Sequence, residues 1–189
     1  MRMAPVCRLP KYGANEMEPN AVARSVDDVH FTFDEFWTAH RDRIARALTL
    51  SIGDADLAAD AVDEAMARAY QRWSTVGTLE HPAGWVYRVA INWARSFHRR
   101  RRRNPPIWLT SDGVGHDDSS MDPSVASALH SLPDAQRDVV VCRLLLGWSE
   151  ARTAEALGTR PGTVKSRLSR AVDTLAERLH HLDPKETFR

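Results

Sequence analysis

The chain has 189 residues, of which 43% are hydrophobic and 27% are charged, and its formal net charge is +1. These fractions are typical of a soluble globular protein with room for one domain or two small ones. No segment has the length or apolar character of a signal peptide or a membrane span, so we expect a cytoplasmic protein. The near-neutral net charge conceals a separation of charges along the chain, because the arginines at 99–103 are followed by an acidic stretch that runs to Asp122.

The two cysteines indicate a reducing compartment. Cys7 lies in an N-terminal stretch with little periodicity, which we expect to be a flexible extension without assigned function, and Cys142 lies on an apolar helical face. There is no Cys-x-x-Cys pair and no clustered His/Cys spacing that would hold zinc. We therefore expect no metal and no other cofactor.

Apolar residues recur at helical spacing in three segments between residues 33 and 103. The first begins at Phe33 and is broken by Gly53, and its expected inward residues are Phe36, Trp37, Ile44 and Leu48. Asp54 or Asp56 can cap the second, whose narrow stripe of mostly small residues predicts close helix packing: Leu57, Ala61, Ala65, Ala69 and Trp73. After a loop with Gly77, Pro82 and Gly84, the expected inward residues of the third helix are Trp85, Val86, Val89, Trp93 and Phe97.

The other face of this third helix is polar and basic, and it leads into the arginine run. Its residues are Arg88, Asn92, Arg95, Arg99 and Arg102. Basic side chains beside aromatic ones suit nucleic acid that must be bent or opened, because aromatic faces stack on unpaired bases. Trp85 and Trp93 are better explained as core residues, because they lie on the expected inward face, whereas the arginines at 99–103 by themselves suit a sequence-independent phosphate contact.

The segment after Asn104 is rich in Ser, Gly and Asp and has no apolar period, so it predicts a linker. Pro133 then opens a helix that Gly147 stops, with Val139, Val140, Leu144 and Leu145 as its apolar residues. The predicted fold class is all-α, with two small helical domains joined by a flexible acidic linker. The expected parts are the extension 1–30, a domain 31–103, the linker 104–128, a helix-turn-helix domain 129–182 and a tail 183–189.

Residues 149–175 predict a helix-turn-helix. Gly158 permits the tight turn after Ala154 and Leu157, Thr159 can cap the second helix, and Pro161 fits its first turn. The expected buried face is Val164, Leu168, Ala171, Val172 and Leu175, and the opposite face carries Arg160, Thr163, Lys165, Ser166, Arg167 and Arg170. A solvated basic face is the alternative, but no acidic residue interrupts this stretch, which favours DNA as the partner.

The second helix presents an acidic face formed by Asp60, Asp63, Glu64 and Arg68, and Met66 and Tyr70 are expected to be semi-exposed beside it. The candidate contact residues are the four residues of this face together with Met66. Such a face can dock a basic helical partner or can simply be solvated. No Gly-rich phosphate loop, nucleophile elbow or His-Glu-x-x-His helix is present, and His180-His181 is an isolated pair, so we do not expect an enzyme.

Taken together, residues 33–180 resemble the extracytoplasmic-function (group IV) sigma factors of the sigma-70 family. Residues 60–70 are similar to the helix that docks on the clamp helices of the largest polymerase subunits. Residues 85–92 are similar to the segment that melts and reads the −10 promoter element, and residues 162–168 to the helix that reads the −35 element. The resemblance implies core RNA polymerase (β and β′ subunits) and promoter DNA as partners, with an anti-sigma factor as a further candidate. It therefore favours docking for the acidic face of the second helix, including Met66.

The sequence departs from the family at a few positions: Asp63, Ala65 and Met66 stand where Gln, Thr and Phe are more usual, and Arg152-Thr153 replaces an acidic-aliphatic pair. Two other functions compete with this hypothesis. A stand-alone helix-turn-helix regulator, such as a response regulator, would have an α/β receiver in the first half. A general nucleic-acid binder that used only the arginines at 99–103 would leave the ordered C-terminal motif unexplained.

Overall fold

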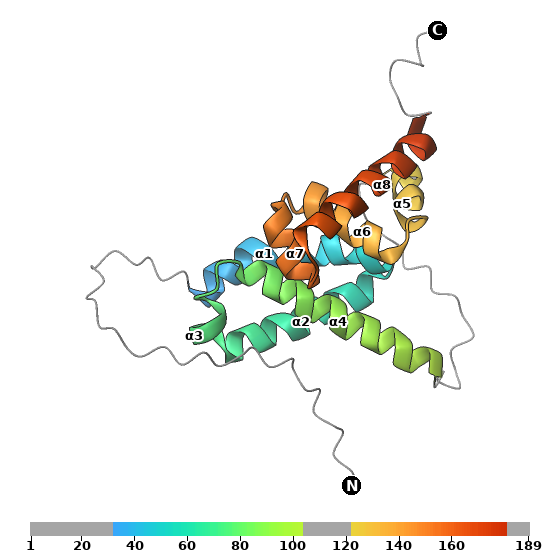
Figure 1. Ribbon diagram of the computed structural model, residues 1–189. Coiled ribbons are helices and arrows are strands. Elements are labelled where there is room, and N and C mark those ends of the chain that lie inside the picture. Colours follow the sequence, from blue (N-terminus) through green and yellow to red (C-terminus); the bar gives the residue numbers. More distant parts are fainter. Residues whose placement is uncertain (1–31, 104–121, 181–189) are drawn as a thin grey trace. The chain divides into compact units, whose positions relative to one another are not determined.

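The computed structural model describes residues 32–103 and 122–180, and all regular secondary structure in these ranges is helical (Figure 1). This confirms the all-α prediction. The predicted extension 1–30, most of the predicted linker and the tail 183–189 lie outside the described residues. The elements in chain order are α1 (Phe33–Ile52), α2 (Ala55–Gln71), α3 (Trp73–Val76), α4 (Pro82–Arg103), α5 (Pro123–His130), α6 (Asp134–Val140), the π-helical turn η1 (Val141–Leu145), α7 (Glu150–Leu157) and α8 (Pro161–Leu179).

Polar caps and glycines delimit the first helices, much as their sequence predicts. Thr32 and Glu35 form a reciprocal capping box at the start of α1, which ends at Gly53 in the left-handed conformation (φ 78°). Asp54 then caps α2 by accepting a hydrogen bond from the backbone N–H of Leu57 at 2.9 Å. The boundary between the first two helices therefore follows from two adjacent residues, Gly53 and Asp54.

Small side chains form the contact between α2 and α4, which lie side by side in Figure 1. On α2 the predicted stripe is buried at Leu57 and at three alanines, and Trp73 is partly buried at the start of α3. On α4 the buried residues include Ala83, Ala90 and Ala94. Alanine on both surfaces allows the two helices to approach closely, as the stripe predicts.

The buried face of α4 is rotated relative to the prediction. The core takes Ala83, Val86, Tyr87, Ala90, Ile91 and Ala94, whereas Trp85, Val89 and Trp93 are only partly buried. Phe97 is 37% exposed and stacks on Trp93, with ring centroids 5.6 Å apart. On α1, Trp37 is 36% exposed, so its predicted inward position is also wrong. Trp37, Trp93 and Phe97 thus flank the core, whereas Phe36 and Tyr87 are buried in it together with smaller side chains.

The second half begins earlier than the sequence predicts. Asp122 caps α5, which occupies residues expected to be linker, and α6 follows Pro133 as expected. The helix then widens into η1, where the Leu146 N–H donates to the Val141 carbonyl at 3.0 Å. Of the apolar residues named for this helix, Val139 and Val140 are buried, whereas Leu144 and Leu145 in the wider turn are 61% and 38% exposed.

The helix-turn-helix is formed by α7 and α8. Ser149 caps α7, Gly158 ends it with a φ of 62°, and Pro161 lies in the first turn of α8 as predicted. The cap residue of α8 is Arg160, without a side-chain cap hydrogen bond, so the predicted Thr159 cap is wrong. Val164 and Ala171 are buried and Leu168 and Leu175 pack against the core, but Val172 is 44% exposed. The predicted buried face is therefore correct except at Val172.

One continuous apolar cluster joins the two halves, and the described residues fall within one compact unit. We call the contact between the halves the seam. Trp148 is central to it, with ring centroids 4.5 Å from His81 and 5.6 Å from Tyr87. Cys142 is buried in the same cluster, and burial raises the pKa of its thiol. Within the described ranges, no helix is long and apolar enough to span a bilayer.

Arg137 anchors the seam from α6 while being almost completely buried. Its Nη1 donates to the carbonyl of Ser51 in α1 at 3.0 Å, and Nε and Nη2 donate to the carbonyls of Leu129 and Leu132 at 3.1 and 2.9 Å. A guanidinium can satisfy several acceptors at fixed angles, so a buried positive charge is tolerated here.

Candidate nucleic-acid interface

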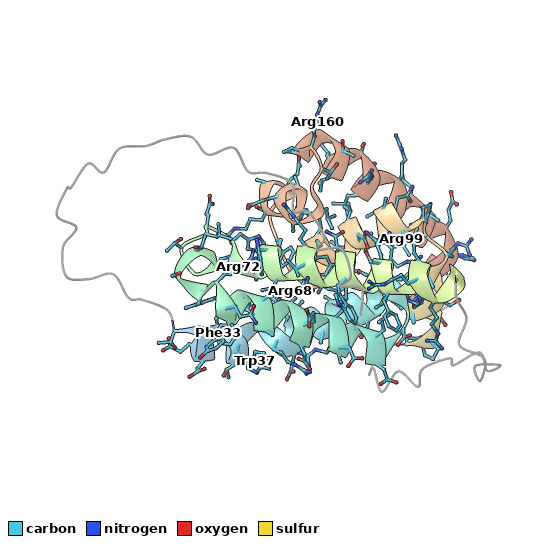
Figure 2. All side chains as sticks on the ribbon, turned by 90° about the horizontal axis from the view of Figure 1, so that it is seen from below. Phe33, Trp37, Arg68, Arg72, Arg99 and Arg160 are labelled. Carbon is cyan, nitrogen blue, oxygen red and sulfur yellow. The ribbon has the colours of Figure 1, made fainter. Side chains whose placement is uncertain are left out.

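Basic side chains project from the first half of α8. Figure 2 shows Arg160 pointing outward, and Lys165, Ser166 and Arg170 are also exposed, while Thr163 and Arg167 are partly buried. Val164 and Ala171 on the other side are buried, which fixes the rotation of the helix. Among the described residues, none of the four cations forms an ion pair. This face is available to an anionic partner.

The predicted basic face of α4 is only partly available. Arg95 Nη2 lies 2.5 Å from Asp138 Oδ2 in α6, and Arg88 Nε donates to the Ala156 carbonyl of α7 at 3.2 Å. Asn92 and Arg99 are exposed, and Arg99 donates to Ser96 Oγ at 2.9 Å within the helix. Arg102 belongs to α4, but its side chain is outside those described. Two of the five predicted residues therefore contact the second half.

Asp138 is absent from the residues predicted for any site, and it has an unusual environment. Its side chain is 5% exposed, and its Oδ1 has no hydrogen-bond partner among the described residues. Burial raises the pKa of its carboxyl, although Arg95 opposes the shift. A carboxylate that is desolvated and only half satisfied is costly to bury. Because its partner is distant in sequence, no local pattern could have identified it.

The acidic face of α2 is confirmed as exposed at Asp60. Asp63 accepts two hydrogen bonds of 2.9 Å from Arg41 in α1, and Glu64 pairs with Arg68 at 2.7 Å one turn along the helix. Met66, in contrast, is completely buried. The expectation that it is semi-exposed is wrong, because it lies on the face of α2 that packs in the core.

An aromatic group lies at the end of α2 that faces the start of α1. Tyr70 is 65% exposed, and the Phe33 ring centroid is 5.0 Å from that of Tyr70, 6.0 Å from that of Trp37 and 5.3 Å from that of Trp73. Figure 2 shows Phe33 and Trp37 beside each other. In the sequence analysis, Phe33 marks only the start of a helix. The four-residue spacing of Phe33 and Trp37, which puts them on the same side of a helix, is the sequence signal that could have indicated their contact.

A cavity of about 520 Å³ opens along the seam, and His81 and Trp148 are among its lining residues. His81 is 6% exposed, and its Nδ1 has no hydrogen-bond partner in the described part of the chain. Burial, with the nearby charges of Arg152 and His40, lowers the pKa of His81 to about 4. The imidazole is thus neutral at physiological pH and packs edge-on against Trp148.

Metal ligation has no support in residues 32–103 and 122–180, where no group of three or more His, Cys, Asp or Glu side chains is placed to hold an ion. The polar groups of α2, α4 and α8 instead form extended charged surfaces. The arrangement consists of two basic helix faces and one acidic face, each opposite a buried stripe. Such faces define a class of protein that binds macromolecules through its helices.

Known families match both halves of the chain. Residues 36–104 match sigma-70 region 2, and residues 124–175 match sigma-70 region 4. The chain is 28% identical over 184 residues to the ECF RNA polymerase sigma factor SigM of Mycobacterium tuberculosis (94% of this chain, 93% of SigM). It is 31% identical over 154 residues to the RNA polymerase sigma-E factor of Streptomyces coelicolor (78% of this chain, 85% of that protein).

The fold is also similar to that of a solved structure, the sigma factor RpoE in complex with the anti-sigma factor NepR from Bartonella quintana. The TM-score is 0.66 at 22% identity, over 78% of this chain and 96% of that one. Because both regions and these relatives agree, the chain belongs to the extracytoplasmic-function sigma factors of the sigma-70 family. It is a sigma factor of transcription initiation, and the stand-alone regulator is not favoured because both halves match.

Proposed function

We propose that the chain docks on core RNA polymerase through the outward face of α2, and that α4 reads the −10 element while α8 reads the −35 element. We infer from its lack of catalytic motifs that the chain itself makes no covalent change to DNA or nucleotide. It acts in the cytoplasm, where its polymerase partner is. An anti-sigma factor is a further proposed partner, by analogy with the solved RpoE complex.

The cationic face of α8 is the observation that carries this proposal. Arg160, Lys165 and Arg170 are exposed, and Arg167 lies mid-face where a side chain can reach base edges in the major groove. Lysine and arginine on the same face contact phosphates and fix the register of the helix. The predicted roles are thus base reading at Arg167 and backbone contact at the flanking cations.

On α4 the proposed −10 set is Arg88, Asn92, Arg95, Arg99 and Arg102. The rotation of α4 supports this role, because it brings Trp93 and Phe97 to the edge of the core instead of its centre. Half-exposed aromatic rings beside arginines suit the stacking of bases that have left the duplex. Buried tryptophans would not have been accessible for that purpose.

For α2, the proposed polymerase contacts are Asp60, Asp63, Glu64 and Arg68, and the burial of Met66 limits that residue to supporting the helix from within. Asp63 and Glu64 already form exposed ion pairs, which contribute little to folding and can be exchanged for pairs with a partner. The face is thus suited to a basic helical surface.

Charge reversal on α2 tests the docking. The variant Asp60→Lys/Glu64→Lys should abolish co-purification of the β and β′ subunits with the tagged full-length chain, while its circular dichroism and melting stay nearly unchanged. The matched control is Asp173→Lys/Glu177→Lys, which reverses two exposed acidic residues at the same spacing on α8. Normal association of the α2 variant with core polymerase would contradict the proposed docking face.

Addition of core polymerase tests promoter reading. The free chain should bind duplex DNA weakly, and the holoenzyme should initiate at specific promoters, because two small reading modules need a scaffold to fix their spacing. Run-off transcription on genomic fragments with purified core polymerase measures this. Tight, sequence-specific binding by the isolated chain, unaffected by core polymerase, would support a stand-alone regulator instead.

A further inference from the structure

The cavity of about 520 Å³ along the seam, which we call the seam cavity, has the size of a small-molecule site. Its lining residues come from α1, α3, the start of α4 and the segment that joins η1 to α7. None of the residues proposed to contact polymerase or DNA is among them. A ligand in the seam cavity would therefore occupy neither the docking face nor the DNA-binding faces.

Part of the lining is aromatic. Phe36 and Trp148 are buried and Trp73 is partly buried, and they reach the cavity from α1, from the loop before α7 and from α3. The ring centroids of Phe36 and Trp73 are 4.9 Å apart. A bare ion gains nothing from aromatic rings in its site, whereas a flat apolar group can pack against them.

The charged part of the lining is mainly basic. Arg43 and Arg152 line the seam cavity, and Glu80 is the only acidic residue among the lining residues that the structure describes. Neither arginine forms an ion pair within the described part of the chain. Burial above all lowers the pKa of His40 and of His81, so both rings are mostly uncharged at neutral pH. The excess of one positive charge that remains matches a single carboxylate better than a phosphate dianion.

His81 brings a polar group that lacks a partner. Its side chain is 6% exposed, and its Nδ1 has no hydrogen-bond partner among the described residues. This nitrogen faces the backbone of α4, because a Cβ at Gly84 would collide with it. A buried N–H without an acceptor is costly, so we expect the neutral ring to carry its proton on Nε2. The Nε2–H is then the group of His81 that can donate to a ligand.

We propose that the seam cavity binds a small aromatic carboxylate. The ring of this ligand packs against the aromatic lining, and its carboxylate accepts hydrogen bonds from His81 Nε2 and from Arg152. Arg43 contributes mainly charge, because its Nη2 already donates to the Leu146 carbonyl at 2.7 Å. The first two residues of α4 also line the cavity, so the positive end of the dipole of that helix favours an anion there.

Three probes separate the parts of this recognition in calorimetric titrations of the full-length chain at neutral pH. Indole-3-carboxylate has both the ring and the charge, and we expect it to bind with a Kd of about 1 mM or lower. Indole-3-carboxamide keeps the ring without the charge, and inorganic phosphate is an anion without a ring. Each of these two should bind at least about tenfold more weakly, because one of the two kinds of contact is lost.

Three substitutions of exposed side chains show whether the carboxylate binds in the seam cavity. Arg152→Gln should weaken the binding of indole-3-carboxylate about tenfold, because a charge-assisted hydrogen bond is lost. Glu80→Gln should tighten it about two- to fivefold, because a like charge is removed. Arg46→Gln is the matched control: it removes an exposed arginine of α1 that does not line the cavity, and it should change the Kd by less than about twofold. Thermal unfolding without ligand checks that all three variants are folded.

Four results would overturn the proposal. The first is that indole-3-carboxylate does not bind the wild-type chain. The second and third are that the carboxamide or inorganic phosphate binds as tightly as the carboxylate, since recognition of the charge or of the ring is then missing. The fourth is that Arg152→Gln and Glu80→Gln both match Arg46→Gln, which would place the ligand elsewhere. Promoter-specific initiation with core polymerase tests the proposed function separately, because it requires none of these residues.

Discussion

The basic faces of α4 and α8 are alike in sequence and different in their surroundings. Each is an arginine-rich stripe opposite a buried one on a long helix. Arg88 and Arg95 on α4 contact the second half of the chain, whereas three of the four cations on the α8 face are exposed and the fourth, Arg167, is partly buried. Charge patterning identifies a face that can bind DNA. Only the tertiary contacts tell whether that face is already in use.

Replacement of Arg137 should have the largest effect on the free energy of unfolding, because this side chain holds the two halves together at the seam. In Arg137→Lys one ammonium replaces donors that reach the carbonyls of Ser51, Leu129 and Leu132, so buried acceptors lose their partners. We expect a loss of about 3–5 kcal/mol in the free energy of unfolding, measured by urea denaturation. Arg167→Lys, on the accessible face, should change it by less than about 0.5 kcal/mol. Equal effects of the two substitutions would contradict the difference between the faces.

Acid should weaken the seam before it affects α8. The pKa of His81 is about 4 in the folded chain, against 6.5 for the free side chain, so the unfolded state binds the proton first. The contribution of neutral His81 to the free energy of unfolding is complete above pH 6.5. It is lost as the pH falls toward 4, by up to about 3 kcal/mol. The half-buried His40, whose pKa is also lowered by burial and by Arg43, adds in the same direction.

Unfolding of wild type and His81→Gln between pH 7 and pH 4 checks this effect. The variant should lose most of the pH dependence, since glutamine does not titrate. Parallel pH profiles for the two proteins would show that another group is responsible.

Arg167→Ala and Arg99→Ala should impair promoter binding in different ways. Arg167 can reach base edges, so its loss should cost about 1–3 kcal/mol and relax preference at particular upstream positions. Arg99 more simply meets phosphates, and its loss should weaken binding evenly and lower the salt dependence. A randomised promoter library, bound by holoenzyme at two salt concentrations, separates the two patterns. A sequence-uniform loss for Arg167→Ala would make it a backbone contact.

The smallest expected effect concerns the turn of the helix-turn-helix. Gly158 has a φ of 62°, and a Cβ there would meet no described atom within 4 Å. Gly158→Ala should therefore cost about 1 kcal/mol through backbone strain alone. Gly162 in α8 has equal space around it without a positive φ. Gly162→Ala should therefore stabilise the helix by about 0.5–1 kcal/mol, as thermal unfolding can measure. A loss at Gly162 would contradict this explanation of the turn.

Local signals predicted the helices well, because each signal acts within a few residues. Gly53, Asp54 and Gly158 mark helix ends through backbone conformation and capping, which do not depend on distant contacts. The short helix α5 was missed because eight residues are too few to show a clear apolar period. The long helices and the helix-turn-helix were therefore predictable, and their exact boundaries less so.

The rotation of α4 was not predictable from hydrophobicity. Ranking by size places Trp93 and Phe97 inward, but the alanine stripe of α2 leaves little room and selects Ala90 and Ala94 instead. The pairing of Arg95 with Asp138 was also beyond local patterns, because it depends on how the two halves meet. The proposed α8 site could be read from the sequence, whereas the occupation of the α4 site could not.

The π-helical turn η1 holds one residue more than an α-helical turn would, and the ladder of backbone hydrogen bonds absorbs that residue locally. Deleting one residue from Val141–Leu145 should therefore close the turn to an α-helix and leave Trp148 in its place against His81 and Tyr87. Deleting one residue from the regular helix α7 should instead turn the residues after it by about 100°. The chain can thus change its length by one residue at η1 without moving the seam, and its regular helices cannot.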